Sequence, residues 1–361
     1  MTESTGSDEI LLPQKNPDLV GHGAAEATLL RALQSGRLPH AWLITGPRGI
    51  GKATLAFRFA RFLLAGGGAP DLFGGPPETL ALDPADPVFR RVAAGGHPDL
   101  RHLKRGVHPK TGKPRMEIVV DDVRLASGFL HKTSAEGGWR VVVIDPADDL
   151  NLNAANALLK SLEEPPSAAI LLLVCHAPGR LLPTIRSRCC HLALGSLPEQ
   201  TVVELLARHL PELEETDRAA LARLAEGSIG RALDLAAGGG LELYREMIAL
   251  FAGLPALDVP RAHAFGDRLA LERDGSAFRT GMELLIWWLA RLARAAAVGR
   301  IPPEVVPGEA ETMARLIAGG GLARWPGLWE KTARRFAAAE SVNLDRKQVV
   351  ITTLLDVQAA A

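Results

Sequence analysis

The chain has 361 residues, 47% of them hydrophobic, and its 41 basic and 41 acidic residues cancel at neutral pH. This length and composition predict two or three folded globular domains and exclude a disordered chain. A formal net charge of zero excludes a global attraction to nucleic acid or to a membrane surface, so any such contact has to be local. The sequence has no signal-peptide pattern and no apolar run long enough to cross a bilayer, which predicts a cytoplasmic protein.

Only three cysteines occur, Cys175, Cys189 and Cys190, which is too few for a disulfide framework in a chain of this size. A structural zinc site with four ligands also has too few thiolates, unless histidines complete it. We therefore expect no metal site and no structural disulfide.

The first half of the chain has the pattern of a layered α/β domain. Residues 1–15 are polar and aperiodic, which predicts a flexible tail. Between 16 and 195, helical stripes alternate with apolar runs at 41–45, 118–120, 141–144 and 170–174. Continuous apolar runs of this kind are typical of parallel strands buried on both faces.

A phosphate-binding loop with one residue replaced follows the first apolar run. Its backbone amides surround phosphates, its lysine reaches the β- and γ-phosphate oxygens, and the next residue supplies a hydroxyl for Mg²⁺. The run at 41–45 predicts the entering strand, and an apolar stripe at 52–64 predicts the leaving helix. The loop consists of Gly46, Pro47, Arg48, Gly49, Ile50, Gly51, Lys52, Ala53 and Thr54.

Ala53 stands where this loop needs its hydroxyl residue. Thr54 follows one position later, and on a helix that position points about 100° away. We therefore expect weak Mg²⁺ binding or none.

Residues 66–116 are rich in glycine and proline, which predicts an irregular insertion with one short helix near 87–94. Within it, 101–105 and 110–115 together carry six cationic side chains and no acid. This pattern is typical of a solvated hairpin. A patch that faces DNA or a partner is the alternative, although no aromatic residue is interleaved for base stacking.

The apolar run at 141–144 ends at Asp145, an acid placed where phosphate-loop ATPases hold the metal ion. Many of these enzymes continue with a glutamate that polarises the attacking water. Here Pro146 follows, which carries no carboxylate, so Asp148 or Asp149 would have to replace the base. The catalytic base is therefore absent from its usual position, as is the hydroxyl that should follow Lys52.

Beyond Leu197-Pro198 the strand pattern stops and helical periodicity continues to the end of the chain. One helical unit covers 196–240 and ends in a run of three glycines, and a second covers 241–361. Trp287 and Trp288 lie in the apolar part of the second unit, which favours core or subunit packing over ligand binding.

Three blocks in the same order resemble the signature series of bacterial clamp-loader subunits of the AAA+ class. They are residues 153–166 (NAANALLKSLEEPP), 186–189 (RSRC) and 227–231 (GSIGR), and His97-Pro98-Asp99 and 118–124 fit the same series. The C-terminal helices share only their helical character with this family, and residues 342–346 are the most similar local stretch. The resemblance implies an AAA+ P-loop parallel-sheet domain at 16–195, a small helical lid at 196–240 and a helical collar at 241–361 that joins a five-subunit ring.

The resemblance also implies roles for single residues. Arg188 would be an arginine finger that enters the ATP site of a neighbouring subunit, a task suited to an always-charged guanidinium. Arg186 lies two residues away and is a competing candidate. The lid would place Arg231 in contact with a bound nucleotide, and Val20 and Gly21 would contact the adenine of that nucleotide. Without the resemblance, Arg188 and Arg231 would both be interpreted as exposed surface residues.

Two departures from the family pattern stand out. Many relatives carry a cysteine-based zinc module after the phosphate-loop helix, but 66–116 contains no cysteine and has to be held in another way. Cys175 and His176 follow the run at 170–174, where active motor subunits place a Thr or Asn that senses the γ-phosphate.

The resemblance therefore implies a largely non-hydrolysing clamp-loader subunit without polymerase activity of its own. Its partners would be the motor gamma/tau and delta subunits and, through the complex, the sliding clamp and primer–template DNA. No cofactor would be required, and ATP or ADP would bind weakly. The main alternative is an active ATPase in which Thr54 and Asp148 or Asp149 replace the missing groups. A third is a DNA-binding adaptor that uses Lys104, Arg105, Lys110 and Lys113.

Overall fold

The structure is a computed structural model that describes residues 12–361 except 68–76, 109–110, 320, 322 and 343. The chain divides into two compact units, Met1–Thr201 and Val202–Ala361. In the described part of the chain no helix is both long and apolar enough to span a bilayer.

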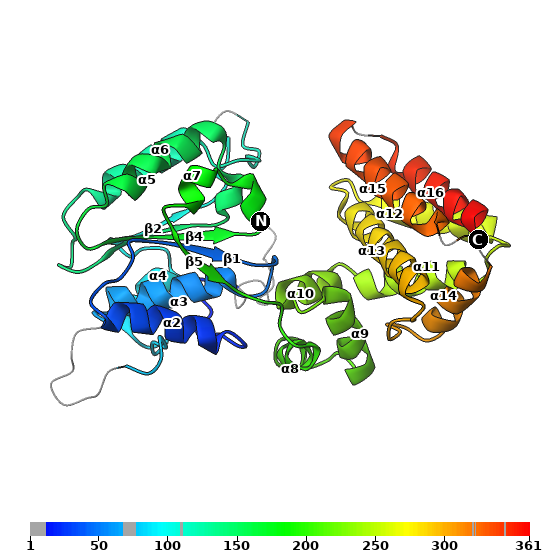
Figure 1. Cartoon of the computed structure of the whole chain (residues 1–361), viewed down its shortest axis with the longest axis horizontal. Coiled ribbons are helices and arrows are strands. Elements are labelled where there is room, and N and C mark those ends of the chain that lie inside the picture. Colours follow the sequence, from blue (N-terminus) through cyan, green and yellow to red (C-terminus); the bar gives the residue numbers. More distant parts are fainter. Residues whose placement is uncertain (1–11, 68–76, 109–110, 320, 322, 343) are drawn as a thin grey trace. The chain divides into compact units, whose positions relative to one another are not determined.

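A five-stranded parallel sheet forms the centre of the first unit (Figure 1). The strand order is β2-β3-β4-β1-β5. All neighbouring pairs are parallel, with Leu43 opposite Leu173 and His191, so β1 is a central strand. The predicted parallel α/β sheet is confirmed. The strands are β1 (Ala41–Thr45), β2 (Leu100–Leu103), β3 (Arg140–Ile144), β4 (Ala169–Cys175) and β5 (Cys190–Ala193).

Helices cover both faces of this sheet (Figure 1). Side chains alternate along each strand, so Trp42 and Ile44 pack in the core under α2–α4, whereas Ala41 and Leu43 pack in the core under α5–α7. The helices are α2 (Gly23–Gln34), α3 (Lys52–Leu64), α4 (Pro87–Ala93), α5 (Val120–Leu130), α6 (Leu152–Glu163) and α7 (Pro183–Arg186), with short 3₁₀ turns η1 (Ala147–Asp149) and η2 (Pro178–Arg180).

Two local predictions in this unit were wrong. The run at 118–120 is no strand, because Ile118 forms only an isolated bridge with Leu150 and α5 begins at Val120. Asp121 and Asp122 occupy the first turn of α5, where acids stabilise a helix. The insertion at 66–116 is also not wholly irregular, since it contains edge strand β2 as well as the predicted short helix.

Buried polar contacts hold the region around α4 without any cysteine. Arg61, only 1% exposed, donates to the carbonyl oxygens of Gln14 and Asn16 at 2.9 and 2.8 Å, and its guanidinium lies 4.4 Å from the Phe89 ring centroid. Buried Asp99 accepts hydrogen bonds from the loop at 134–136. The end of the predicted tail is thereby bound to α3, whereas residues 1–11 lie outside the described part.

The described residues of the second unit form helices and connecting turns, as predicted. Because this unit is compact as a whole, its division into a lid at 196–240 and a collar at 241–361 stays a prediction. Its helices, with α8 crossing the boundary, are α8 (Glu199–His209), α9 (Glu215–Ala225), α10 (Ile229–Ala237), α11 (Gly240–Ala252), α12 (Val259–Leu271), α13 (Ser276–Val298), α14 (Glu309–Ala318), α15 (Arg324–Val342) and α16 (Arg346–Ala360).

Candidate functional site

The phosphate-binding loop lies at the carboxyl end of β1, between Thr45 and the first residue of α3, Lys52. Its sharp course requires glycine at the first position, because Gly46 has a φ of 142° and a Cβ there would stand 2.3 Å from the carbonyl oxygen of Leu194. Gly51 precedes the helix with a φ of 105°. The predicted strand, loop and helix are therefore confirmed.

The Lys52 ammonium is turned onto the loop itself. Nζ donates to the carbonyl oxygen of Gly46 at 2.7 Å and also to that of Pro47, and the residue is 2% exposed. Burial lowers the pKa of Lys52 to about 8, although the negative charges of Asp145 and Asp148 oppose this shift. The loop thus keeps its lysine and holds it with backbone oxygens.

Asp145 follows β3 and interacts electrostatically with the Lys52 and Arg48 cations. Burial nevertheless raises the pKa of Asp145, because removing the carboxylate from water outweighs the attraction of these cations. The structure therefore brings together the loop lysine and the acid that the sequence predicted for the same site.

The residues proposed to replace the missing catalytic groups are a buried threonine and two carboxylates that already have partners. Thr54 is 8% exposed within α3. An Asp148 oxygen accepts the backbone N–H of His176 at 2.8 Å. Burial favours a higher pKa for Asp148, but this hydrogen bond and others lower it overall. Asp149 pairs with Arg105 at 3.0 Å. Each carboxylate thus has a structural partner.

Cys175 and His176 close the site at the end of β4. Burial and the Lys52 cation lower the pKa of His176 to about 4, so its imidazole is neutral at pH 7. Burial and Asp148 raise the pKa of the Cys175 thiol to about 12. Among the described residues, no three His, Cys, Asp or Glu side chains are grouped as metal ligands.

His22 is a loop contact that the sequence analysis missed. Its Nε2 donates to the carbonyl oxygen of Ile50 at 2.6 Å, and the residue is buried. The preceding Val20 is half-buried, and Gly21 has a φ of 81° where a Cβ would stand 2.3 Å from Leu197. The predicted adenine-side segment therefore packs beside the loop, and the only signal for His22 was its position after Gly21.

Arg188 lies just beyond α7 with its side chain 36% exposed. One guanidinium nitrogen, Nη1, donates to the carbonyl oxygen of Thr184 at 3.0 Å, and the other, Nη2, lies 2.8 Å from the Glu163 carboxylate. Arg186 is half-buried, and its Nε is buried with no hydrogen-bond partner among the described residues. Of the two arginines, Arg188 is the accessible one.

Arg231 belongs to the second unit, in the first turn of α10. Ser228 caps this helix by accepting the backbone N–H of Arg231 at 3.1 Å. The Arg231 guanidinium lies 4.0 Å from Glu226 and is 33% exposed. Its predicted contact with a nucleotide stays a prediction.

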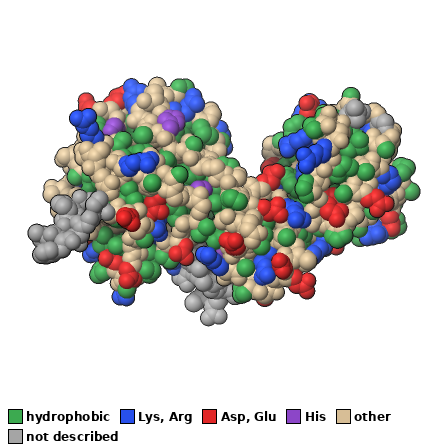
Figure 2. All heavy atoms as spheres, turned by 60° about the horizontal axis from the view of Figure 1, so that its bottom comes forward, with side chains coloured by type: hydrophobic (Ala, Val, Ile, Leu, Met, Phe, Trp, Pro, Cys, Tyr) green, Lys and Arg blue, Asp and Glu red, His purple; other side chains and the backbone are tan. Residues whose placement is uncertain are grey.

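The basic segments divide between two elements, since 101–103 belong to edge strand β2, and the predicted hairpin follows it with Val107 bridged to Pro114 in antiparallel fashion. Two arginines of these segments have acidic partners, since Arg105 pairs with Asp149 and Arg115 lies 3.4 Å from Asp122. Lys110 lies outside the described residues. Figure 2 shows basic and acidic side chains interspersed on the face it draws.

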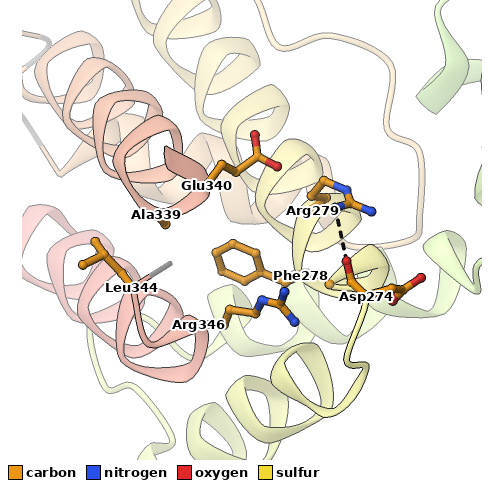
Figure 3. Close-up of a pocket in the computed structure, with 8 residues that line it drawn as sticks. Asp274, Phe278, Arg279, Ala339, Glu340, Leu344 and Arg346 are labelled. Atoms are coloured by element: carbon orange, nitrogen blue, oxygen red, sulfur yellow. Dashed lines mark hydrogen bonds between the residues drawn. The ribbon is translucent and has the colours of Figure 1, made fainter. Parts of the chain in front are cut away.

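A separate pocket of about 460 Å³ is lined by residues of the second unit alone, including Phe278, Glu340 and Arg346 (Figure 3). Arg346 begins α16 and donates to the carbonyl oxygen of Glu272 at 2.8 Å. A Cβ on Gly275 would stand 2.6 Å from this guanidinium. Arg346, the last residue of the family-like segment 342–346, therefore ties α16 to the turn before α13.

Comparisons with known proteins find relatives among the subunits of DNA polymerase III. A family model described as DNA polymerase III, delta subunit, matches residues 21–198. The delta' subunit of DNA polymerase III from Pseudomonas aeruginosa is 44% identical over 173 residues, which is 48% of this chain and 48% of that protein. The delta' subunit from Escherichia coli is 37% identical over 264 residues, 73% of this chain and 71% of that protein.

Among solved structures, a gamma subunit-related protein from Thermotoga maritima matches 92% of this chain and 99% of its own chain. Its TM-score is 0.38 at 17% sequence identity. The sequence matches above are the stronger comparison. The match to the Pseudomonas aeruginosa relative spans about half of that protein's length.

Proposed function

The chain belongs to the delta' family of DNA polymerase III subunits, and from this premise we propose that it is a clamp-loader subunit that presents Arg188 to the ATP site of a neighbouring motor subunit. The observation that carries the proposal is the exposed guanidinium of Arg188, the second arginine of the RSRC block, held at two of its nitrogens. An arginine supplied from outside stabilises charge on the transferred phosphoryl group and contributes about 10³ to 10⁵ in rate.

We propose that the phosphate-binding loop of this chain supports little or no ATP hydrolysis. Ala53 offers no hydroxyl to Mg²⁺, and Pro146 offers no base. The substitutes Asp148 and Asp149 are engaged by the His176 amide and by Arg105. Because Lys52 and the glycine turn remain, we expect the loop to bind ATP or ADP weakly, and the subunit to require no cofactor.

The proposed partners follow from the family. They are the motor gamma/tau and delta subunits, and through the assembled complex the sliding clamp and primer–template DNA. Polymerisation would belong to another subunit. We place the chain in the cytoplasm, at the replisome on the nucleoid.

The test is the DNA-stimulated ATPase of a clamp loader reconstituted from the full chain, the motor subunits and delta. We expect Arg188→Ala to lower the rate of the site that it serves by about 10³-fold or more. Arg186→Ala is the matched control, since it removes a half-buried arginine of the same block, and it should leave most of the rate intact in assembled complexes. Equal losses from both variants would contradict the assignment of Arg188.

A further inference from the structure

We propose that Glu163 is a positioning residue for Arg188, and that its carboxylate fixes the guanidinium in the orientation in which it meets a phosphate of the neighbouring subunit. The inference rests on the proposed function of Arg188. Two residues that are 25 positions apart in the sequence meet here through a contact of 2.8 Å between Glu163 Oε1 and Arg188 Nη2.

The guanidinium is held at two points rather than one. Nη2 faces Glu163, and Nη1 donates to the carbonyl oxygen of Thr184 at 3.0 Å. Two contacts to different nitrogens define the plane of a rigid, planar group, whereas one contact leaves it free to rotate. A guanidinium has five N–H donors, so these two contacts leave others available for a phosphate.

Both anchors come from rigid parts of the fold. Glu163 is the last residue of α6, and Leu162 beside it is buried in the same core as Ile185 of α7. Figure 1 shows α6 and α7 on the same face of the sheet. Pro165 and Pro166 follow after Glu164 and prevent the helix from continuing. The conspicuous LEEPP sequence thus places a carboxylate at a fixed point next to the finger.

The contact is suited to orientation and contributes little to folding. The side chains of Arg188 and Glu163 are 36% and 50% exposed, and an ion pair this accessible is screened by water and adds little to stability. Holding a long side chain before it acts removes conformational freedom that would otherwise be lost when the neighbouring site reacts. Removing Glu163 should therefore slow turnover without unfolding the chain.

The experiment measures kcat and KM for ATP in the reconstituted clamp loader with DNA and clamp, after assembly has been checked by size-exclusion chromatography. Glu163→Ala should lower kcat by about 2- to 5-fold, the size expected for one exposed ion pair, with KM unchanged. Glu163→Gln should restore part of this loss, because its amide oxygen still accepts a hydrogen bond. The matched control is Glu164→Ala, which removes the neighbouring exposed carboxylate and should have no effect.

A double-mutant cycle separates positioning from a general structural effect. In an Arg188→Ala background, Glu163→Ala should cause no further loss, because its target is gone. An equal loss in both backgrounds, or a higher rate from Glu163→Ala alone, would overturn the inference. If Arg188→Ala is sensitive but Glu163→Ala is not, only this inference fails, whereas an insensitive Arg188→Ala removes the proposed function itself.

Discussion

The Nζ atom of Lys52 donates a hydrogen bond of 2.7 Å to the carbonyl oxygen of Gly46, so the first and the seventh residues of the phosphate loop are joined to each other. The loop therefore retains the strand, turn and helix of a phosphate-binding loop. The site lacks the hydroxyl for Mg²⁺, because Ala53 follows Lys52. It also lacks the catalytic carboxylate, because Pro146 follows Asp145. A site of this kind fits a subunit whose contribution to hydrolysis is made in a neighbour's site.

Restoring the missing hydroxyl should restore metal-assisted binding. We expect Ala53→Thr to tighten binding of Mg·ADP by about tenfold, the effect of one added interaction with a charged group. Turnover should stay absent because Pro146 still supplies no base. Titration with a fluorescent ADP analogue, with and without Mg²⁺, measures this change. The control is Ala53→Val, which has the shape of threonine without its hydroxyl, and equal tightening by both variants would refute the explanation.

The burial of Lys52 should make stability depend on pH. Its pKa is lowered from 10.5 to about 8, so between these two values the unfolded chain binds more protons than the folded chain. Stability contributed by this group therefore rises with pH across that window. We expect the free energy of unfolding of the wild type, measured in urea, to rise from pH 8 to pH 10 relative to that of Lys52→Met. A constant difference would show that the lysine is not desolvated.

Much of this site could be predicted from the sequence, because its signals are local. The bounds of β1 and α3 follow from an apolar run and from the glycine turn between them. Strand β2 was missed because its four residues, LRHL, include only two apolar side chains, as suits an edge strand. The strand expected at 118–120 failed because its apolar residues precede the two acids of a helix start.

The contacts around Arg188 could not be predicted in the same way. The sequence favoured Arg188 and left Arg186 as a competing candidate, and burial separates the two in the structure. The partner Glu163 lies in another block of the sequence and reaches Arg188 through the packing of α6 and α7. The hydrogen bond from His22 to Ile50 likewise joins residues that no local pattern connects.

The turn before α13 provides a prediction for the second unit. Gly275 has a φ of 74°, and an added Cβ would also meet Arg346 at 2.6 Å. Gly299 has a φ of 71° with open space around it, so it is a matched control for backbone strain alone. We expect Gly299→Ala to cost about 1 kcal/mol and Gly275→Ala about 1 kcal/mol more, in urea unfolding.

The excess cost of Gly275→Ala should disappear when Arg346 is also changed to alanine, because the collision is with its guanidinium. The Arg346→Ala change alone should still destabilise the unit by about 1 kcal/mol, since it loses the hydrogen bond to the carbonyl oxygen of Glu272. Equal costs for the two glycine variants would rule out this steric explanation.

The most direct measurement of the central claim is the DNA-stimulated ATPase of the reconstituted clamp loader with Arg188→Ala and, separately, with Lys52→Ala. The first change removes the group offered to a neighbour, and the second removes the lysine of the chain's own loop. The account predicts a large loss with Arg188→Ala and almost none with Lys52→Ala, in complexes that assemble normally. A large loss with Lys52→Ala and none with Arg188→Ala would instead make this chain a motor subunit and contradict the account.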